Sequence, residues 1–359
     1  MQYARAFAAI AVFYYHISAT VLSTYPNAEI AVDYVGAAGV DLFFVISGFI
    51  MTLVVARNRA FDPSRFMLAR IGRIAPLYWL LTLTVFAVVA SGAVNLNSVD
   101  TDWARLVHSL LFVPYGVEEF PAPILLVGWT LNYEMFFYAL VAVCVGVLGD
   151  RKLIATAFLL CALTVVGASA DPVNGYIEFY TDPIVVEFAF GIACYHCHER
   201  TRTAGGHSVG GKGVWWALFL SGLLLLTFQF EIDPGNMRPL YWGVPAFMLL
   251  LGGLHVVTFR SEMLRRIGDW SYAIYLLHLF VVIGTVRFAL PALAEYGIPW
   301  WIYYALMTVI LLVLSWIVHE AVEKPVACAW SLVTTGRLRS AVSGKTVSRA
   351  ARRHEARRT

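Results

Sequence analysis

The sequence predicts an all-α fold, a polytopic membrane helix bundle of about ten transmembrane helices with both termini in the cytoplasm. Hydrophobic residues make up 60% of the 359 residues and charged residues only 14%. The mean hydropathy of +0.71 is far above that of soluble globular proteins. In addition, apolar runs of about 20 residues, the length that crosses a bilayer, follow one another with short gaps.

Ten such runs occur, and we expect each to form one helix. They lie at residues 4–22, 36–56, 74–92, 127–149, 152–169, 182–199, 213–230, 240–258, 270–290 and 300–322. Basic residues gather in every second connection, so that 23 of the 26 lysines and arginines fall on one side of the predicted bundle. Cytoplasmic loops carry the excess of positive charge, which places both termini inside.

The predicted membrane-embedded domain covers residues 1–325, and we expect residues 326–359 to form a basic, disordered cytoplasmic tail. The longest outer connection, 93–126, contains a half-apolar stretch from Trp103 to Phe112 that predicts a helix on the membrane surface. The run CYHCH at 194–198 is similar to a metal-ligand set. One short segment cannot usually close a tetrahedral site, so we expect no metal.

Ionisable residues inside the predicted spans are functional candidates, because a charge at the bilayer centre costs on the order of 3 kcal/mol even on a lenient scale. These residues are His16, Asp41, Glu134, Glu187 and His278. At a rise of about 1.5 Å per residue, we expect His16 and Glu134 at the same depth, with Asp41 and Glu187 just above them. The pattern predicts a polar cavity that opens to the outer side.

His16 has the properties of a general base. It lies eleven residues after Arg5, so both side chains project from one face of their helix. A neutral imidazole oriented by a carboxylate is the usual arrangement of such a base, so we expect Glu134 to orient His16. The alternative for His16 alone is a structural histidine bonded to a neighbouring carbonyl.

Arg70 and Arg73 lie one helical turn apart at the predicted cytoplasmic mouth, where they can grip phosphate groups together. The alternative for this pair is a topological role as positive charges on the inner side. We expect that topological role for Arg57, Arg59 and Arg65.

Seven segments occur in a specific order along the ten predicted helices. They are RAFAAIAVFYYH at 5–16, GVDLFFVISGF at 39–49, ARIGRIAPLYW at 69–79, GWTLNYEMFFY at 128–138, EFAFGIACY at 187–195, SYAIYLLH at 271–278 and EKP at 323–325. On these segments the chain resembles the acyltransferase 3 family of bacterial membrane O-acyltransferases, which includes exopolysaccharide-modifying members.

The resemblance implies roles for individual residues. His16 would be the catalytic base, or a transient acyl carrier, and Glu134 would orient it or the acceptor hydroxyl. Asp41 is a third catalytic candidate, which could bond the acceptor or support His16. The expected acyl-CoA-binding residues are Arg5, Arg70 and Arg73. The residues that could line the cavity are Glu187, Tyr275, His278 and Ser47; helix packing for Ser47 and a buried structural role for His278 are the alternatives.

The activity implied is transfer of an acyl group, usually from acetyl-CoA in the cytoplasm, to a hydroxyl of an extracytoplasmic or lipid-linked glycan such as exopolysaccharide or O-antigen. The alternative is a secondary transporter for a sugar or small anion. We expect the bacterial inner membrane as the location, and lipids, acyl-CoA as co-substrate and a glycan acceptor as partners, without nucleic acid or a permanently bound cofactor. The acyl group, the acceptor and the oligomeric state are not determined by the sequence.

Overall fold

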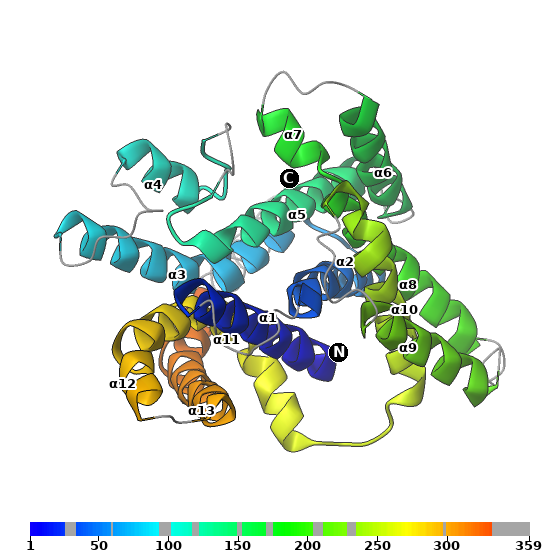
Figure 1. Ribbon diagram of the computed structural model, residues 1–359. Coiled ribbons are helices and arrows are strands. Elements are labelled where there is room, and N and C mark those ends of the chain that lie inside the picture. Colours follow the sequence, from blue (N-terminus) through cyan, green and yellow to red (C-terminus); the bar gives the residue numbers. More distant parts are fainter. Residues whose placement is uncertain are drawn as a thin grey trace, which may run out of the picture.

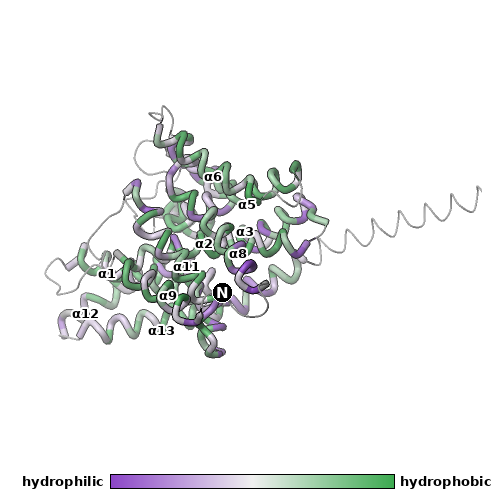
Figure 2. Tube along the Cα trace, turned by 90° about the vertical axis from the view of Figure 1, so that its right-hand side faces the viewer, coloured by the Kyte–Doolittle hydropathy of each residue, from purple (hydrophilic) through white to green (hydrophobic). Residues whose placement is uncertain are grey.

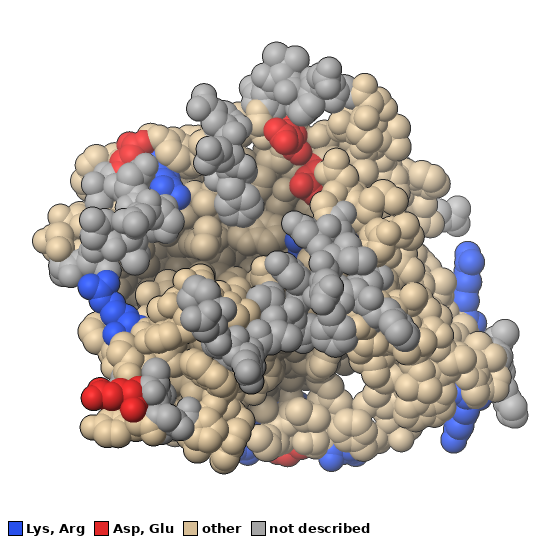
Figure 3. Space-filling view, viewed as in Figure 1, with Lys and Arg blue, Asp and Glu red and all other residues tan. Residues whose placement is uncertain are grey.

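The computed structural model describes residues 1–25, 34–58, 60–92, 102–116, 122–148, 153–169, 175–203, 211–227, 235–296 and 299–331. All regular secondary structure in these ranges is helical, so the predicted all-α class is confirmed. Figure 2 shows hydrophobic residues along most of the helices. The face seen in Figure 3 is largely uncharged, with most of its lysines and arginines towards the edge.

Each of the ten predicted runs overlaps a long helix in the part of the chain that the structure describes. The long helices are α1 (Gln2–Thr24), α2 (Gly39–Arg57), α3 (Pro63–Ala90), α5 (Trp129–Leu148), α6 (Leu153–Ser169), α8 (Val186–Thr203), α9 (Lys212–Thr227), α10 (Val244–Val256), α11 (Glu262–Phe288) and α13 (Trp300–Val318). Seven helices of the described chain are long and apolar enough to cross a membrane, and α6 and α9 are shorter apolar helices. The multi-pass membrane class follows from these lengths.

Short helical segments connect these elements. They are η1 (Tyr34–Ala38), α4 (Trp103–Leu110), η2 (Leu126–Gly128), α7 (Gly175–Thr181), η4 (Pro183–Val185), η5 (Gly235–Met237), η6 (Pro239–Gly243), α12 (Leu290–Glu295) and η7 (His319–Glu323). The helix predicted from Trp103 is confirmed as α4, and it begins at Asp102, whose carboxylate accepts the Ala104 N–H at 3.0 Å.

Helix α1 lies at the centre of the bundle, between α2 and α11 (Figure 1). Helix α2 also packs against α8. Elsewhere in the bundle, α10 packs against α9 and α13 packs against α11. The contact of α2 with α8 depends on two glycines, because a Cβ on Gly48 would come within 2.1 Å of the Phe188 carbonyl oxygen and one on Gly191 within 2.2 Å of the Val45 carbonyl oxygen. Close approach of backbones through small residues is the usual way in which membrane helices associate.

The end of the described chain differs from the prediction. Helical residues continue through Ser331, which includes the first six residues of the predicted disordered tail. The Trp330 indole donates a hydrogen bond of 2.9 Å to the Leu68 carbonyl oxygen of α3. This contact between helices fixes the segment, whereas residues 332–359 lie outside the described part of the chain.

Candidate active site

A cavity of about 90 Å³ lies between α1, α2, α3, α5 and α11. Its lining contains the three predicted arginines, Arg5, Arg70 and Arg73, together with Glu134. Ser47 and Tyr275, both predicted to line a cavity, are also part of this wall. The structure therefore brings residues from five helices and from sequence positions 5 to 275 into one polar space.

Glu134 is held by hydroxyl groups inside this cavity. Its Oε1 accepts a hydrogen bond of 3.2 Å from the Ser47 hydroxyl and another from the Tyr138 hydroxyl, one turn further along α5. Arg5 lies within electrostatic reach of the Glu134 carboxylate, on the facing wall. Glu134 is thus an anchored anion among arginines, and Tyr138 is a site residue that the sequence analysis did not select.

Arg70 and Arg73 present donors without protein acceptors to this region. The Nε of Arg70 is buried and has no hydrogen-bond partner, while its guanidinium carbon lies 5.8 Å from the centre of the Phe66 ring. Arg73 is exposed and lines both this cavity and a second, larger pocket. Guanidinium groups bind phosphate and carboxylate oxygens through paired N–H donors, so both side chains suit an anionic ligand.

The second pocket has a volume of about 820 Å³ and shares Arg5, Arg73 and Tyr272 with the first. Its other basic lining residues are Arg265, Arg266 and Lys324. We call the end of the bundle that contains these five basic residues the Arg73 end. Two tryptophans, Trp270 and Trp316, complete an aromatic part of the wall.

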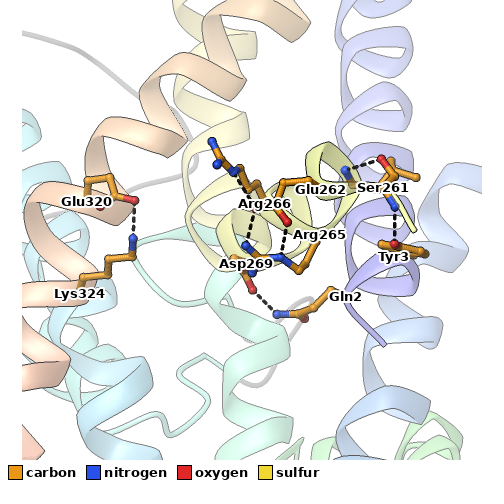
Figure 4. A network of polar contacts seen from close by, with 10 residues as sticks. Gln2, Tyr3, Ser261, Glu262, Arg265, Arg266, Asp269, Glu320 and Lys324 are labelled. Atoms are coloured by element: carbon orange, nitrogen blue, oxygen red, sulfur yellow. Dashed lines mark hydrogen bonds and ion pairs between the residues drawn. The ribbon is translucent and has the colours of Figure 1, made fainter. Parts of the chain in front are cut away.

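Ion pairs cross the wall of this pocket (Figure 4). Arg265 donates to both Glu262 oxygens, at 2.6 and 2.8 Å, and to Asp269 at 2.8 Å. Lys324 donates to Glu320 at 2.5 Å. Such exposed pairs contribute little to stability because solvent screens them, so an anionic ligand can replace the carboxylates as the partner of these cations at small cost.

His16 is oriented by the main chain and by a second histidine. Its Nδ1 lies 2.9 Å from the Val12 carbonyl oxygen, and its ring centroid lies 4.8 Å from that of His278. Part of the His16 ring is accessible, whereas His278 is fully buried. Tyr275, in the wall of the 90 Å³ cavity, has its ring centroid 5.7 Å from that of His278. The hydrogen bond expected from Glu134 is therefore made by the backbone instead.

The structure does not bring His16 and Glu134 together in the cavity. Glu134 lines the 90 Å³ cavity with Arg5 and Ser47, whereas His16 lines neither this cavity nor the 820 Å³ pocket. Gly39 at the start of α2 lies against Ala8 of α1. Ser47 on α2 and His16 on α1 each lie about 12 Å from this contact along their own helix.

Asp41 and Glu187 lie together at the end of the bundle opposite to Arg73. Both are fully buried, and Asp41 accepts two hydrogen bonds of 2.9 Å from Nε and Nη2 of Arg238. Glu187 lies beside Asp41, and both of its oxygens are buried. The Arg238 guanidinium lies 4.8 Å from the Trp242 ring and 5.8 Å from the Trp129 ring. Asp41 is therefore an anchor between α2 and the segment before η6, and its contact is with Arg238 instead of His16.

Arg238 is a site residue that was not among those predicted from the sequence. A signal for Arg238 was present in the sequence, since it is one of only three basic residues on the predicted outer side, and a lone cation next to apolar helices needs an acidic partner.

In the run at 194–198, His198 forms a hydrogen bond of 3.2 Å with His255. The described residues contain no group of three or more His, Cys, Asp or Glu placed to hold a metal ion.

Fold and site define a class of protein, a polytopic membrane protein with an arginine-lined polar cavity inside its helix bundle. The sequence profile of the acyltransferase 3 family, described as an acyltransferase domain, matches residues 1–320. The chain therefore belongs to the acyltransferase 3 family, as its motifs predicted. It is a membrane acyltransferase, a class that uses an acyl donor and lies among membrane lipids.

Curated relatives extend over most of the chain. Exopolysaccharide production protein ExoZ of Rhizobium meliloti (strain 1021) is 34% identical over 262 residues, which cover 69% of this chain and 77% of that protein. Nodulation protein 10 of Rhizobium leguminosarum bv. viciae is 27% identical over 320 residues, with coverage of 79% and 81%. Acyltransferase MdmB of Streptomyces mycarofaciens is 25% identical over 313 residues, with coverage of 77% of each chain. No solved structure matches the chain significantly.

Proposed function

We propose that this protein is a membrane O-acyltransferase that moves an acyl group from cytoplasmic acyl-CoA to a glycan hydroxyl, with acetyl as the first group to test. The acceptor would be an extracytoplasmic or lipid-linked glycan, such as exopolysaccharide or O-antigen. The observation that carries the proposal is the arrangement of the two pockets. A large pocket with five basic residues at the Arg73 end shares Arg5, Arg73 and Tyr272 with the arginine-lined cavity inside the bundle.

Acyl-CoA fits this arrangement by its chemistry. Its nucleotide part carries several phosphates and an aromatic base, which suit the arginines, Lys324 and the tryptophans of the 820 Å³ pocket. Its pantetheine arm is long and uncharged, and would pass Arg5 and Arg73 into the bundle. From Arg5 to His16 the rise along α1 is about 16 Å, a distance that such an arm bridges.

His16 would act as the general base. Its Nδ1 bonds the Val12 carbonyl, so the neutral ring presents the lone pair of Nε2. Nε2 takes the proton of the acceptor hydroxyl, the hydroxyl oxygen attacks the thioester carbonyl carbon, and the C–S bond of the tetrahedral intermediate breaks. The departing thiolate takes the proton back from His16, so the base is regenerated and free coenzyme A and the ester are the products.

In this proposal, the distribution of basic residues decides from which side of the membrane the donor and the acceptor enter. The Arg73 end contains the basic residues of the connections that the positive-inside pattern assigns to the cytoplasm, so the donor would enter there. The acceptor would approach from the Asp41 end, and the bacterial inner membrane is the corresponding location. The name of ExoZ supports an exopolysaccharide as the first acceptor to test.

The test is acceptor-dependent release of coenzyme A from acetyl-CoA by purified protein, together with mass spectrometry of the glycan. We expect an acetyl ester on the glycan with the wild-type protein and none with His16→Ala. His108→Ala is the matched control, because this histidine belongs to α4 and bonds the Pro114 carbonyl at 3.0 Å, away from both pockets. Full activity of His16→Ala would overturn the proposed role of the base, and glycan uptake into vesicles without any donor would indicate a transporter.

A further inference from the structure

His16 and His278 form a facing pair of imidazoles between α1 and α11, and neither residue lines the 90 Å³ cavity or the 820 Å³ pocket. They come from α1 and α11, which lie side by side, and their ring planes are inclined by 52° at a centroid distance of 4.8 Å. The rings touching the pair belong to Tyr15, 5.0 Å from His16, and Tyr275, 5.7 Å from His278. Among the described residues no carboxylate or guanidinium forms an ion pair or hydrogen bond with either imidazole.

Main-chain hydrogen bonds fix the same tautomer in both rings. His16 Nδ1 lies 2.9 Å from the Val12 oxygen and His278 Nδ1 lies 2.6 Å from the Tyr275 oxygen. A carbonyl oxygen only accepts, so both Nδ1 atoms carry hydrogen and both Nε2 atoms present lone pairs when the rings are neutral. His278 Nε2 is buried and has no hydrogen-bond partner.

An unpaired buried acceptor is costly, and it is satisfied by any donor that comes within reach. While it is neutral, His16 has no hydrogen at Nε2 and cannot donate to His278. Once His16 has taken a proton at Nε2, this N–H can donate to His278 Nε2. The two neutral rings make no hydrogen bond to each other in the described structure. Their spacing is compatible with one, as His198 and His255 make a hydrogen bond of 3.2 Å between ring nitrogens at a centroid distance of 4.9 Å.

The two rings differ in access, and this divides their roles. His16 is partly accessible and can meet a substrate, whereas His278 is fully buried and can act only through His16. The buried ring faces no anion that would stabilise a positive charge on its neighbour. A hydrogen-bond acceptor at His278 Nε2 therefore takes the place that a carboxylate has in many general-base pairs.

Resting on the proposed function, we propose that His278 is a positioning residue that holds the proton of the reaction: its Nε2 accepts a hydrogen bond from protonated His16. The O–H bond of the acceptor breaks, an N–H bond forms on His16 Nε2, and this hydrogen is shared with His278 Nε2. When the C–S bond breaks, the departing thiolate takes the proton and both rings return to the neutral state.

The experiment compares His278→Phe, which keeps a flat ring and removes the acceptor, with His278→Gln, which keeps an acceptor oxygen. In the full-length purified protein we expect His278→Phe to lower kcat by about tenfold or more at unchanged KM for acetyl-CoA. Its pH–rate profile should also change: the acidic limb shifts to lower pH by about one unit, because protonated His16 has lost its partner. His278→Gln should retain most of kcat and the position of the limb.

His255→Phe is the matched control, since it removes a ring from the other histidine pair of similar spacing and should change neither kcat nor the limb. His278→Leu replaces the phenylalanine variant if the latter does not fold. A lower kcat with an unmoved limb would show a merely structural role for His278 and overturn this inference, as would full activity. Activity of His16→Ala would instead overturn the proposed function, so the two failures are distinguishable.

Discussion

Replacing Arg238 by methionine tests whether the buried Asp41–Arg238 pair holds the helices together. Both Asp41 oxygens accept a hydrogen bond of 2.9 Å, the Asp41 side chain is 0% exposed and that of Arg238 is 22% exposed. Removing one member of a buried pair leaves an uncompensated charge and costs about 3–5 kcal/mol. At roughly 2–4 °C per kcal/mol, the unfolding midpoint should fall by about 6–20 °C.

The assay is thermal unfolding of the purified protein in detergent, followed by tryptophan fluorescence. The double variant Asp41→Asn/Arg238→Met should recover a large part of the lost stability, because it removes the buried charge. Arg65→Met is the matched control: Arg65 and Asp62 form a pair at 3.3 Å whose side chains are 59% and 42% exposed. An exposed pair contributes about 0–1 kcal/mol. Equal midpoints for Arg238→Met and Arg65→Met would refute the anchoring role of the pair.

Three further predictions concern helix packing, donor binding and pH. Gly191→Ala places a methyl group within 2.2 Å of the Val45 carbonyl oxygen, so the yield of folded protein should fall sharply in size-exclusion chromatography; a normal elution profile would contradict the packing. Arg73→Ala should raise KM for acetyl-CoA by about tenfold or more, because a charged hydrogen bond is lost, whereas Arg57→Ala, outside both pockets, should not. The pKa of Asp102 lies below its usual value because it accepts hydrogen bonds from Tyr115 and the Ala104 N–H. The contribution of Asp102 to the stability of α4 is therefore present above the unfolded pKa of about 3.9 and is lost as the pH falls through the lower folded value. Rate-corrected hydrogen exchange should show α4 equally protected at pH 7 and pH 5, and less protected at pH 2.5.

Much of the fold could be predicted because its signals are local. Each helix of spanning length appears in the sequence as an apolar run, since the bilayer imposes length and polarity on every segment separately. The sequence also predicted that Arg5, Arg70 and Arg73 act together, and all three line one cavity. It placed Glu134 beside His16, however, and Glu134 instead lies among these arginines.

The partners within the site could not be predicted in the same way. Asp41 lies 197 residues from Arg238 in the sequence, and His16 lies on α1 whereas His278 lies on α11. Counting depth from the helix ends predicted that His16 and Glu134 share one site, but Glu134 lines the 90 Å³ cavity and His16 does not. A spacing rule describes one helix and contains no information on the register of two.

The sequence by itself determined the membrane class, the family and which polar residues lie within apolar helices, because the hydropathy of a segment depends on that segment alone. Only the tertiary structure decided that Asp41 pairs with Arg238, that Glu134 is held by Ser47 and Tyr138, and that His16 faces a second imidazole. The physical reason is that these contacts arise where helices cross, and the crossing points are set by close packing of small residues from distant parts of the chain.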